Sequence, residues 1–339
     1  DVVQSAGRQI STGSDNTLLG YKSGRAIQTG SNNTLIGSNA GANLSSGVNN
    51  LVLGYQAAFN LSSGSYNTVL GPQAGFSMND ASYNISSGYQ AGYKQQSGSG
   101  NINMGYKAGY TMINQSNNIH IGYLAGYTST ADNNIFLGAS AGTQNTVGTN
   151  NIFMGTQAGA GNNTYGTSGQ QQGNYNTFVG YYAGNANYSG TKNIFMGYQA
   201  GLSSQQGSKN IFIGDNTGSL GDTSHNIFIG TARNDGQGVG YLATTVGGSG
   251  PNAGEYNVFV GHDVGIENTN GYDNVFLGDG AGKANTEGHD NIYMGTQAGY
   301  SSNTAGANFN IAIGYQTALN NLAGQENIII GKGAAADGT

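Results

Sequence analysis

The chain of 339 residues contains no cysteine and no tryptophan, only two prolines, and only 8% charged residues. The lack of cysteine fits a secreted bacterial or viral surface protein that does not rely on oxidation. Lysine and arginine together number 10 and the net charge is −6. Because clustered basic charge drives binding to nucleic-acid phosphates, we expect no nucleic-acid partner.

Long apolar runs are also missing. No stretch approaches the 18 or so apolar residues of a membrane-spanning helix, so we expect no membrane insertion within this segment. No signal peptide is visible at Asp1, and we expect the chain to be a mature or trimmed product. Low charge with 61 glycines would fit a disordered chain, but here Ile, Leu, Met and Phe recur in tight triplets at a fixed period, which predicts a packed core.

The triplets belong to a nine-residue phrase, of which Asn193–Gly201 is one copy, and the phrase recurs eighteen times. The commonest step between copies is 17 residues, and a Gly stands four residues after each opening Asn. The opening asparagines are Asn16, Asn33, Asn50, Asn67, Asn84, Asn101, Asn118, Asn134, Asn151, Asn176, Asn193, Asn210, Asn226, Asn257, Asn274, Asn291, Asn310 and Asn327.

Seventeen residues is too short for a helix-pair repeat or a propeller blade, and the frequent glycines disfavour helix. The period suits one coil of a parallel β-solenoid with two short strands and two turns. We therefore predict an all-β solenoid of about eighteen coils over residues 16–335, preceded by a cap or linker at 1–15 and followed by a tail at 336–339. Two spacers are enlarged, at 160–175 and 235–256.

The three residues after each Asn form the expected strand. The first is mostly β-branched, and the third is Leu, Ile, Val or Met except at Ser87. Since side chains alternate along a strand, these two share a face, which we expect to be the core of the coil. The residue between them then points outward, and it is Phe in every copy from Phe136 to Phe276. The opening Asn has two interpretations: a ladder of stacked amides, or a turn former that tolerates the left-handed region.

Phrases such as Asn193–Gly201 and Asn134–Gly142 resemble the head repeats of trimeric autotransporter adhesins, and equally the related repeats of bacteriophage tail fibres and bacterial trimeric surface fibres. The resemblance covers nearly the whole chain. It implies a left-handed parallel β-roll, three chains side by side, and attachment at a cell or virion surface. The adhesin coil is usually shorter than 17 residues. No anchor barrel, coiled-coil stalk or chaperone domain is found, so we expect a segment of a longer fibre.

An outward Phe ladder would form an apolar patch of a kind that monomers avoid, so we predict that it is the contact between chains of a homotrimer. The alternative is that a second strand of the same chain covers the ladder, in a monomer or an end-to-end filament. The predicted interface residues are Phe136, Phe153, Phe178, Phe195, Phe212, Phe228, Phe259 and Phe276.

Insertions in a solenoid project from one face, which is often the binding face. The two enlarged spacers carry Tyr, Gln and acidic side chains suited to contacts with sugars or proteins, although passive loops would look similar. The candidate ligand-binding residues are Tyr165, Gln171, Tyr175, Tyr241, Glu255 and Tyr256. A row of tyrosines after the core Gly, including Tyr89, Tyr106 and Tyr123, is either a second candidate surface or corner packing.

Titratable groups give no catalytic motif, and no cofactor or metal motif is found. Asp273 and Asp290, with His289 adjacent, are either a cation site or solvated turn acids. His120 takes the outward slot beside Asn103 and Ser86, where we expect a polar plug in the interface rather than a ligand.

These patterns together with the resemblance imply an extracellular, non-enzymatic fibre segment on a cell or virion. It would display a binding surface, with itself and a host-surface glycan or protein as partners. The alternatives are a self-assembling filament subunit without a specific ligand, and a carbohydrate-active β-helix enzyme, which would need two acids within catalytic distance.

Overall fold

The computed structural model describes residues 5–162, 173–219, 223–231, 238–240, 254–301, 307–320 and 324–336. The chain divides into two compact units, residues 1–163 and 164–339. The described residues contain no helix, and their eighteen short strands are divided equally between the units. The predicted boundaries of a single domain at 16–335 stay a prediction, as does the handedness of the coil.

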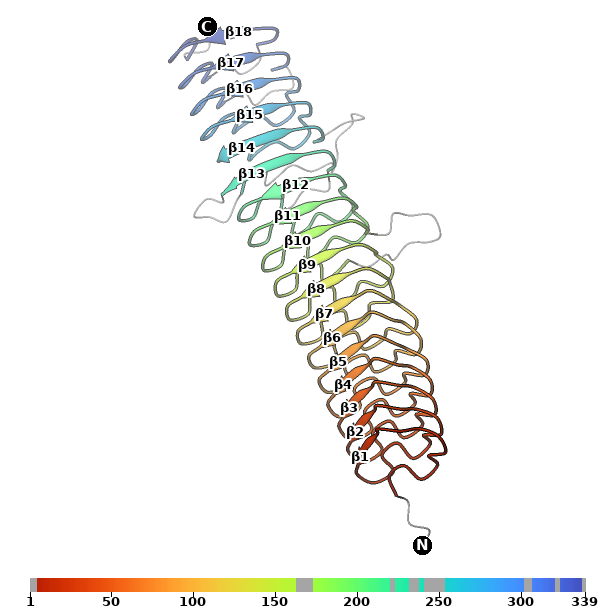
Figure 1. The fold of residues 1–339 in the computed structure, drawn as a ribbon. Coiled ribbons are helices and arrows are strands. Elements are labelled where there is room, and N and C mark those ends of the chain that lie inside the picture. Colours follow the sequence, from red (N-terminus) through yellow and green to blue (C-terminus); the bar gives the residue numbers. More distant parts are fainter. Residues whose placement is uncertain are drawn as a thin grey trace. The chain divides into compact units, whose positions relative to one another are not determined.

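The N-terminal unit stacks its strands in chain order, each paired in parallel with the next and in the same register (Figure 1). Its strands are β1 (Thr17–Leu19), β2 (Thr34–Ile36), β3 (Leu51–Leu53), β4 (Thr68–Leu70), β5 (Ile85–Ser87), β6 (Ile102–Met104), β7 (Ile119–Ile121), β8 (Ile135–Leu137) and β9 (Ile152–Met154). Before β1, the backbone N–H of Gly7 already donates to the carbonyl of Ser23 at 3.0 Å, so the stacking begins ahead of the first strand.

The C-terminal unit repeats the arrangement, with Phe178 opposite Phe195 and Phe195 opposite Phe212. Its strands are β10 (Thr177–Val179), β11 (Ile194–Met196), β12 (Ile211–Ile213), β13 (Ile227–Thr231), β14 (Val258–His262), β15 (Val275–Leu277), β16 (Ile292–Met294), β17 (Ile311–Ile313) and β18 (Ile328–Ile330).

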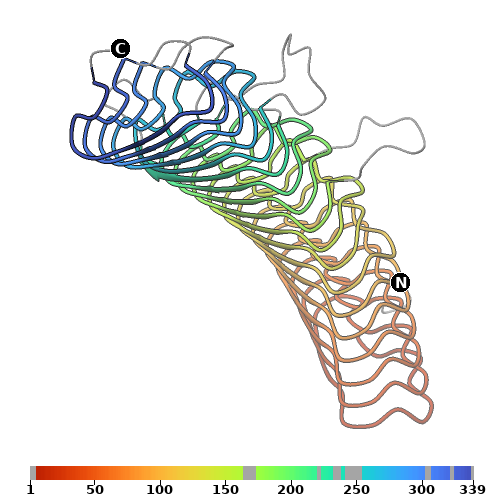
Figure 2. The ribbon, with the colours of Figure 1, turned by 90° about the horizontal axis from the view of Figure 1, so that it is seen from above.

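Each coil is one loop of backbone around a narrow core, as the stacked loops of Figure 2 show. The prediction of a parallel β-solenoid with a 17-residue coil is confirmed. The prediction of two strands per coil is wrong, because the described part of each coil holds one strand. Turns that donate to the next coil replace the second strand, as when Ser45 N–H bonds the carbonyl of Ser62 at 2.8 Å.

The central residue of each strand points into the coil, opposite to the sequence prediction. In a single chain the predicted interface residues all have zero exposed area; they are Phe136, Phe153, Phe178, Phe195, Phe212, Phe228, Phe259 and Phe276. The rings stack from coil to coil, and that of Phe195 lies 4.8 Å from Phe178 and 4.9 Å from Phe212 between centroids. A fully buried side chain has no surface to offer a second chain, so assigning these residues to a chain–chain interface is wrong.

In the coils where the residue eleven places after the opening Asn is described, that residue forms a second buried column, which faces the strand centres and explains why the phenylalanines fit inside. Where the side chain at the centre of the strand is small, the side chain in the second column is large. Val52, for example, is paired with Leu61, and both belong to one buried apolar cluster. Where the strand centre is large, the column is small, as for Phe195 with the buried Ser204. In these coils a larger strand centre is thus matched by a smaller partner across the interior, which suits close packing.

The opening asparagines form the predicted ladder of stacked amides. Asn50 is representative: its Oδ1 accepts from both the backbone N and Nδ2 of Asn67, at 3.0 Å each. Its Nδ2 donates to Oδ1 of Asn33 at 3.0 Å and to the carbonyl of Gly64 at 2.9 Å. Asn50 is 2% exposed. The turn-forming role belongs instead to the residue before it, since Asn49 has φ 55°.

Glycine is required at two corner positions for different reasons. Gly197 has φ 139°, and a Cβ there would lie 2.3 Å from the carbonyl oxygen of Gly214 in the next coil. Gly201 has φ 61°, and a Cβ there would lie 2.4 Å from the ring of Phe195. The first glycine permits the coils to stack, and the second provides the space that the phenylalanine ring occupies.

Candidate functional surfaces

The first and third residues of each strand form a surface of aliphatic side chains, which we call the apolar face. The structure points these residues outward, where the sequence analysis expected them in the core. In the N-terminal unit, Met104 is 40% exposed and Ile121 is 38% exposed. In the C-terminal unit, Ile194 and Met196 are 38% and 40% exposed. The apolar face of each unit is three residues wide and extends along all its strands.

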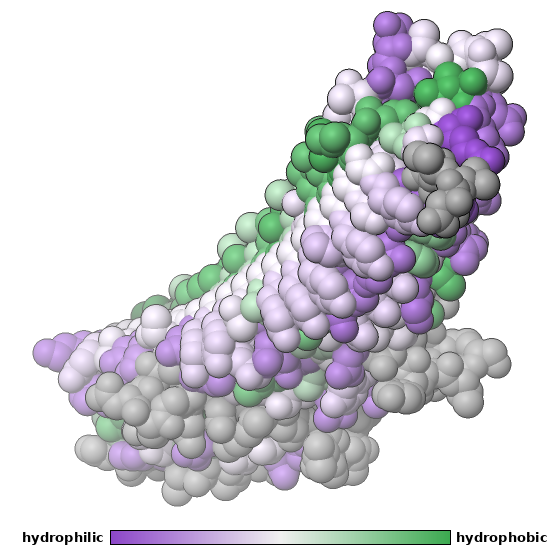
Figure 3. All heavy atoms as spheres, turned by 90° about the horizontal axis from the view of Figure 1, so that it is seen from below, coloured by the Kyte–Doolittle hydropathy of each residue, from purple (hydrophilic) through white to green (hydrophobic). Residues whose placement is uncertain are grey.

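No charged residue occupies any position of the apolar face, where only Thr and Ser87 interrupt the aliphatic side chains. Figure 3 shows such green apolar side chains gathered in a band beside paler and purple polar surface. If each partly exposed side chain offers about 60 Å², the nine strands of one unit present on the order of 1,000 Å². That exceeds the few hundred Å² of contiguous apolar surface usual on a monomer.

A second surface of the N-terminal unit carries two stacked aromatic ladders. Tyr89, Tyr106 and Tyr123 stack at centroid distances of 5.6 and 5.2 Å, and all three are exposed. The other ladder comprises Phe59, Phe76, Tyr93, Tyr110 and Tyr127, whose successive centroids lie 5.1–5.3 Å apart. Glutamine amides also stack from coil to coil on this unit: Nε2 of Gln73 donates to Oε1 of Gln56 at 3.0 Å, and Nε2 of Gln90 donates to Oε1 of Gln73 at 2.8 Å. The rings pack on one another at the corner and remain accessible, and their role as a second candidate surface stays a prediction.

Half of the predicted ligand-binding residues, namely Tyr165, Gln171 and Tyr241, lie outside the described residues. Tyr175 and Tyr256 are exposed, but both occupy the left-handed position just before an opening Asn, with φ 59° and 56°. The ring of Tyr256 stacks on His225 at 4.7 Å. These two tyrosines therefore belong to the regular turn of a coil. The backbone carbonyl of Glu255 accepts from Asp273 N–H at 3.2 Å, as equivalent positions do in other coils.

The acids Asp273 and Asp290 occupy the same left-handed turn position, with φ 52° and 56°. Burial, followed by repulsion from Asp290, raises the pKa of Asp273, while His289 opposes the shift. His289 Nδ1 lies 2.8 Å from Asp290 Oδ2. Within the described ranges, no three His, Asp or Glu side chains are placed to hold a metal ion.

One cluster of charges in the C-terminal unit was not predicted from the sequence. His262 Nδ1 lies 3.0 Å from Asp279 Oδ1, and Lys283 Nζ donates to Asp263 Oδ2 at 3.1 Å. The 17-residue spacing of His262 and Asp279 could have indicated this pairing, because residues one coil apart are neighbours. His262 and Asp279 are largely exposed, and pairs of that kind contribute only about 0–1 kcal/mol.

His120 lies inside its coil and is fully buried, so the predicted polar plug between chains is wrong. Its Nδ1 is 3.1 Å from Asn103 Oδ1, and its ring stacks on Phe136 at 5.1 Å. Burial lowers the pKa of His120 to about 3. The neighbouring strand centres Asn103 and Ser86 are buried too, and they form a polar section in an otherwise apolar column.

Across the described part of the chain, no helix has the length and apolar character needed to cross a membrane. Comparison of the chain with family models, with curated proteins and with solved structures finds no match in any of the three.

Proposed function

We propose that this chain is a structural and adhesive fibre segment that assembles as a homotrimer through the apolar face. The role is extracellular, on a cell or virion, and it is scaffolding rather than catalysis. The observation that carries the proposal is the uncharged aliphatic surface that follows every strand of both units. It replaces the phenylalanine ladder as the proposed contact between chains.

Further copies of the same chain are the occupants that fit this face. About 1,000 Å² per unit meets the roughly 800 Å² per partner found in stable interfaces. Every copy has the same spacing between strands, about 4.8 Å, so side chains of facing copies can interdigitate along the whole stack. The face is only three residues wide, or about 10 Å. Three such narrow strips can enclose one common apolar interior, and the resemblance to trimeric surface fibres supports that number.

Two isoleucines with nearly equal exposure provide a matched test. Ile121 lies on the apolar face and is 38% exposed, while Ile113 lies in a turn of the same unit and is 40% exposed. We expect the wild-type chain to have a native mass three times 34.6 kDa. Ile121→Asp buries a charge in the interface and should yield folded monomers, whereas Ile113→Asp should leave the trimer intact. Met196→Asp makes the same test in the C-terminal unit.

Native mass spectrometry over a range of concentrations separates the outcomes. A wild-type chain that stays monomeric, or an Ile121→Asp variant that stays trimeric, would refute the proposed interface. A native mass of two chains would contradict the trimer and indicate that the apolar faces of two chains pack against each other. Fibres that lengthen with concentration would favour the alternative of a filament subunit without a specific ligand.

A further inference from the structure

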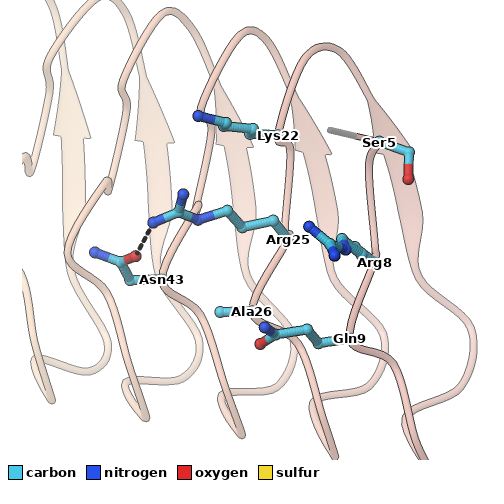
Figure 4. Close-up of a pocket in the computed structure, with 7 residues that line it drawn as sticks. All are labelled: Ser5, Arg8, Gln9, Lys22, Arg25, Ala26 and Asn43. Atoms are coloured by element: carbon cyan, nitrogen blue, oxygen red, sulfur yellow. Dashed lines mark hydrogen bonds between the residues drawn. The ribbon is translucent and has the colours of Figure 1, made fainter. Parts of the chain in front are cut away.

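A hollow of about 280 Å³ opens on the N-terminal unit, and it gathers three of the ten lysines and arginines of the chain. The three cations are Arg8, Lys22 and Arg25, and the amide side chains of Gln9 and Asn43 also line the hollow (Figure 4). Nothing in the repeat requires this concentration of positive charge, because later coils carry mostly neutral residues at the same positions.

The period of the solenoid explains how the hollow forms. Arg8 and Arg25 are 17 residues apart and so occupy equivalent places in adjacent coils. Gln9, Ala26 and Asn43 form the neighbouring column in the same way. Alanine between two amide side chains leaves a depression, and Figure 4 shows the two arginines extending alongside it. The hollow thus arises because one side chain in a column is smaller than its neighbours, while the backbone stays regular.

Neutral amide groups orient the positive charge in the hollow, and no described acidic side chain pairs with it. Nη2 of Arg25 donates to Oδ1 of Asn43 at 3.3 Å, and Nδ2 of Asn43 donates to Oδ1 of Asn60 at 3.2 Å. An amide therefore holds the guanidinium in place without cancelling its charge. Among the described residues no ion pair involves Arg8, Lys22 or Arg25.

Acidic residues are also scarce in this part of the chain. Between residues 5 and 79 the sequence has one acid, Asp15, which accepts from Ser14 Oγ at 3.0 Å. Within the described residues these three cations have no acidic partner, and on a chain whose net charge is −6 they provide a local site for an anion.

We propose that this hollow binds an acidic sugar unit of a polysaccharide, with Arg8 and Arg25 holding its carboxylate or sulfate. Guanidinium groups match both anions through paired hydrogen bonds, and Lys22 adds a point charge. The amides of Gln9 and Asn43 suit the sugar hydroxyls. The volume is at the lower end of small-molecule sites, which suits one ring rather than a folded partner. Nucleic acid fits less well, because it requires basic charge spread along a surface.

The column of Arg8 and Arg25 continues, after the buried Ala42, into the aromatic ladder that begins at Phe59. A bound polysaccharide that leaves the hollow along this column would next meet rings and tyrosine hydroxyls. The role in attachment rests on the proposed function, whereas the anion site stands without it.

Titration calorimetry of the full chain tests the site with four probes. These are a heparin oligosaccharide, an oligogalacturonate, neutral dextran, and a single-stranded DNA oligonucleotide. Binding of heparin or galacturonate, with dextran inert, is expected, and the stronger of the two identifies sulfate or carboxylate as the anion. Stronger binding of DNA than of both acidic glycans, or equal binding of dextran, would overturn the proposal.

Single substitutions of the residues that line the hollow test whether the glycan binds there. Arg25→Gln and Arg8→Gln should each weaken binding about tenfold or more, since each removes a charge-assisted pair of hydrogen bonds. Two lysines above tyrosine rings form a matched pair: Lys22 lies 4.9 Å from the ring of Tyr21, and Lys332 lies 5.9 Å from that of Tyr315. Lys22→Gln should weaken binding several-fold, and Lys332→Gln should not.

Unchanged affinity in both arginine variants would place the anion elsewhere and overturn the proposal. Circular dichroism and native mass of the same variants show whether fold and assembly persist. A chain that binds the acidic glycan as a monomer would contradict the proposed trimer and leave the anion site supported.

Discussion

Replacement of Phe195 by alanine tests whether the phenylalanine ladder is the core of the coil. The ring has no exposed area and is stacked between Phe178 and Phe212 at 4.8 and 4.9 Å. Truncating such a residue removes its buried area and leaves a cavity, at a cost of about 3–5 kcal/mol. The adjacent Met196 points outward and is 40% exposed in a single chain, so Met196→Ala opens no cavity inside the coil and should cost a separated chain roughly 1 kcal/mol or less.

Urea denaturation followed by far-UV circular dichroism compares the two variants, both made in the Ile121→Asp background, where the chains are expected to be monomeric and a lost interface contact does not contribute. In a stack of coils the damage is confined to the altered coil and its neighbours. We therefore expect an early transition in Phe195→Ala that is absent from Met196→Ala. If the two variants unfold alike, the assignment of inner and outer positions is wrong. Phe195→Asp separates core from interface further: it should unfold the coil, whereas folded monomers would show that the ring contacts another chain.

Two further predictions address the polar groups of the interior. Asn50→Ala removes four hydrogen bonds and leaves the backbone N–H of Asn67 buried without its acceptor, which should lower the free energy of unfolding by about 2–4 kcal/mol in urea titrations; Asn49→Gly, at the exposed turn where φ is 55°, is the control because glycine tolerates that backbone conformation. The pKa of His120 is about 3 in the folded chain and 6.5 when unperturbed, so its contribution is complete above pH 6.5 and is lost as the pH falls toward 3, by on the order of a few kcal/mol. His120→Phe should remove that part of the pH dependence, and an identical pH profile in the variant would show that another group is responsible.

The sequence was sufficient to predict the repeat, the coil and the amide ladder, because each depends only on spacing. Residues 17 apart become neighbours in any solenoid, so Asn33 and Asn50 had to meet. The direction of the side chains did not follow from spacing, since the strands are apolar on both faces and alternation alone does not say which is inside. The assignment made for Phe195, Ile194 and Met196 was therefore reversed.

Two signals in the sequence could have corrected that assignment. An asparagine ladder is stable only when it is shielded from water, and Asn193 has the same parity along the strand as Phe195, so both side chains point inward. The match of Phe195 with Ser204, and of Val52 with Leu61, indicates that each pair shares one interior. The hollow at Arg25 was missed for another reason: it depends on a small residue, Ala26, between two larger ones in adjacent coils.

Among the described residues, each coil forms hydrogen bonds to other coils only where these lie directly before or after it. The number of coils in the stack can therefore change without disturbing the rest. Removing Ile194–Asn210 would leave Asn193 directly before Ile211, with every column still continuous. A gene for such a chain can thus gain or lose coils by recombination between repeats. Each coil gained or lost changes the length of the stack by about 4.8 Å. The coil of Asn103 is an exception, because its loss would take from His120 the hydrogen-bond partner that keeps it inside. Most other coils can be added or removed by selection for a longer or shorter stack, without any change to the residues of the core.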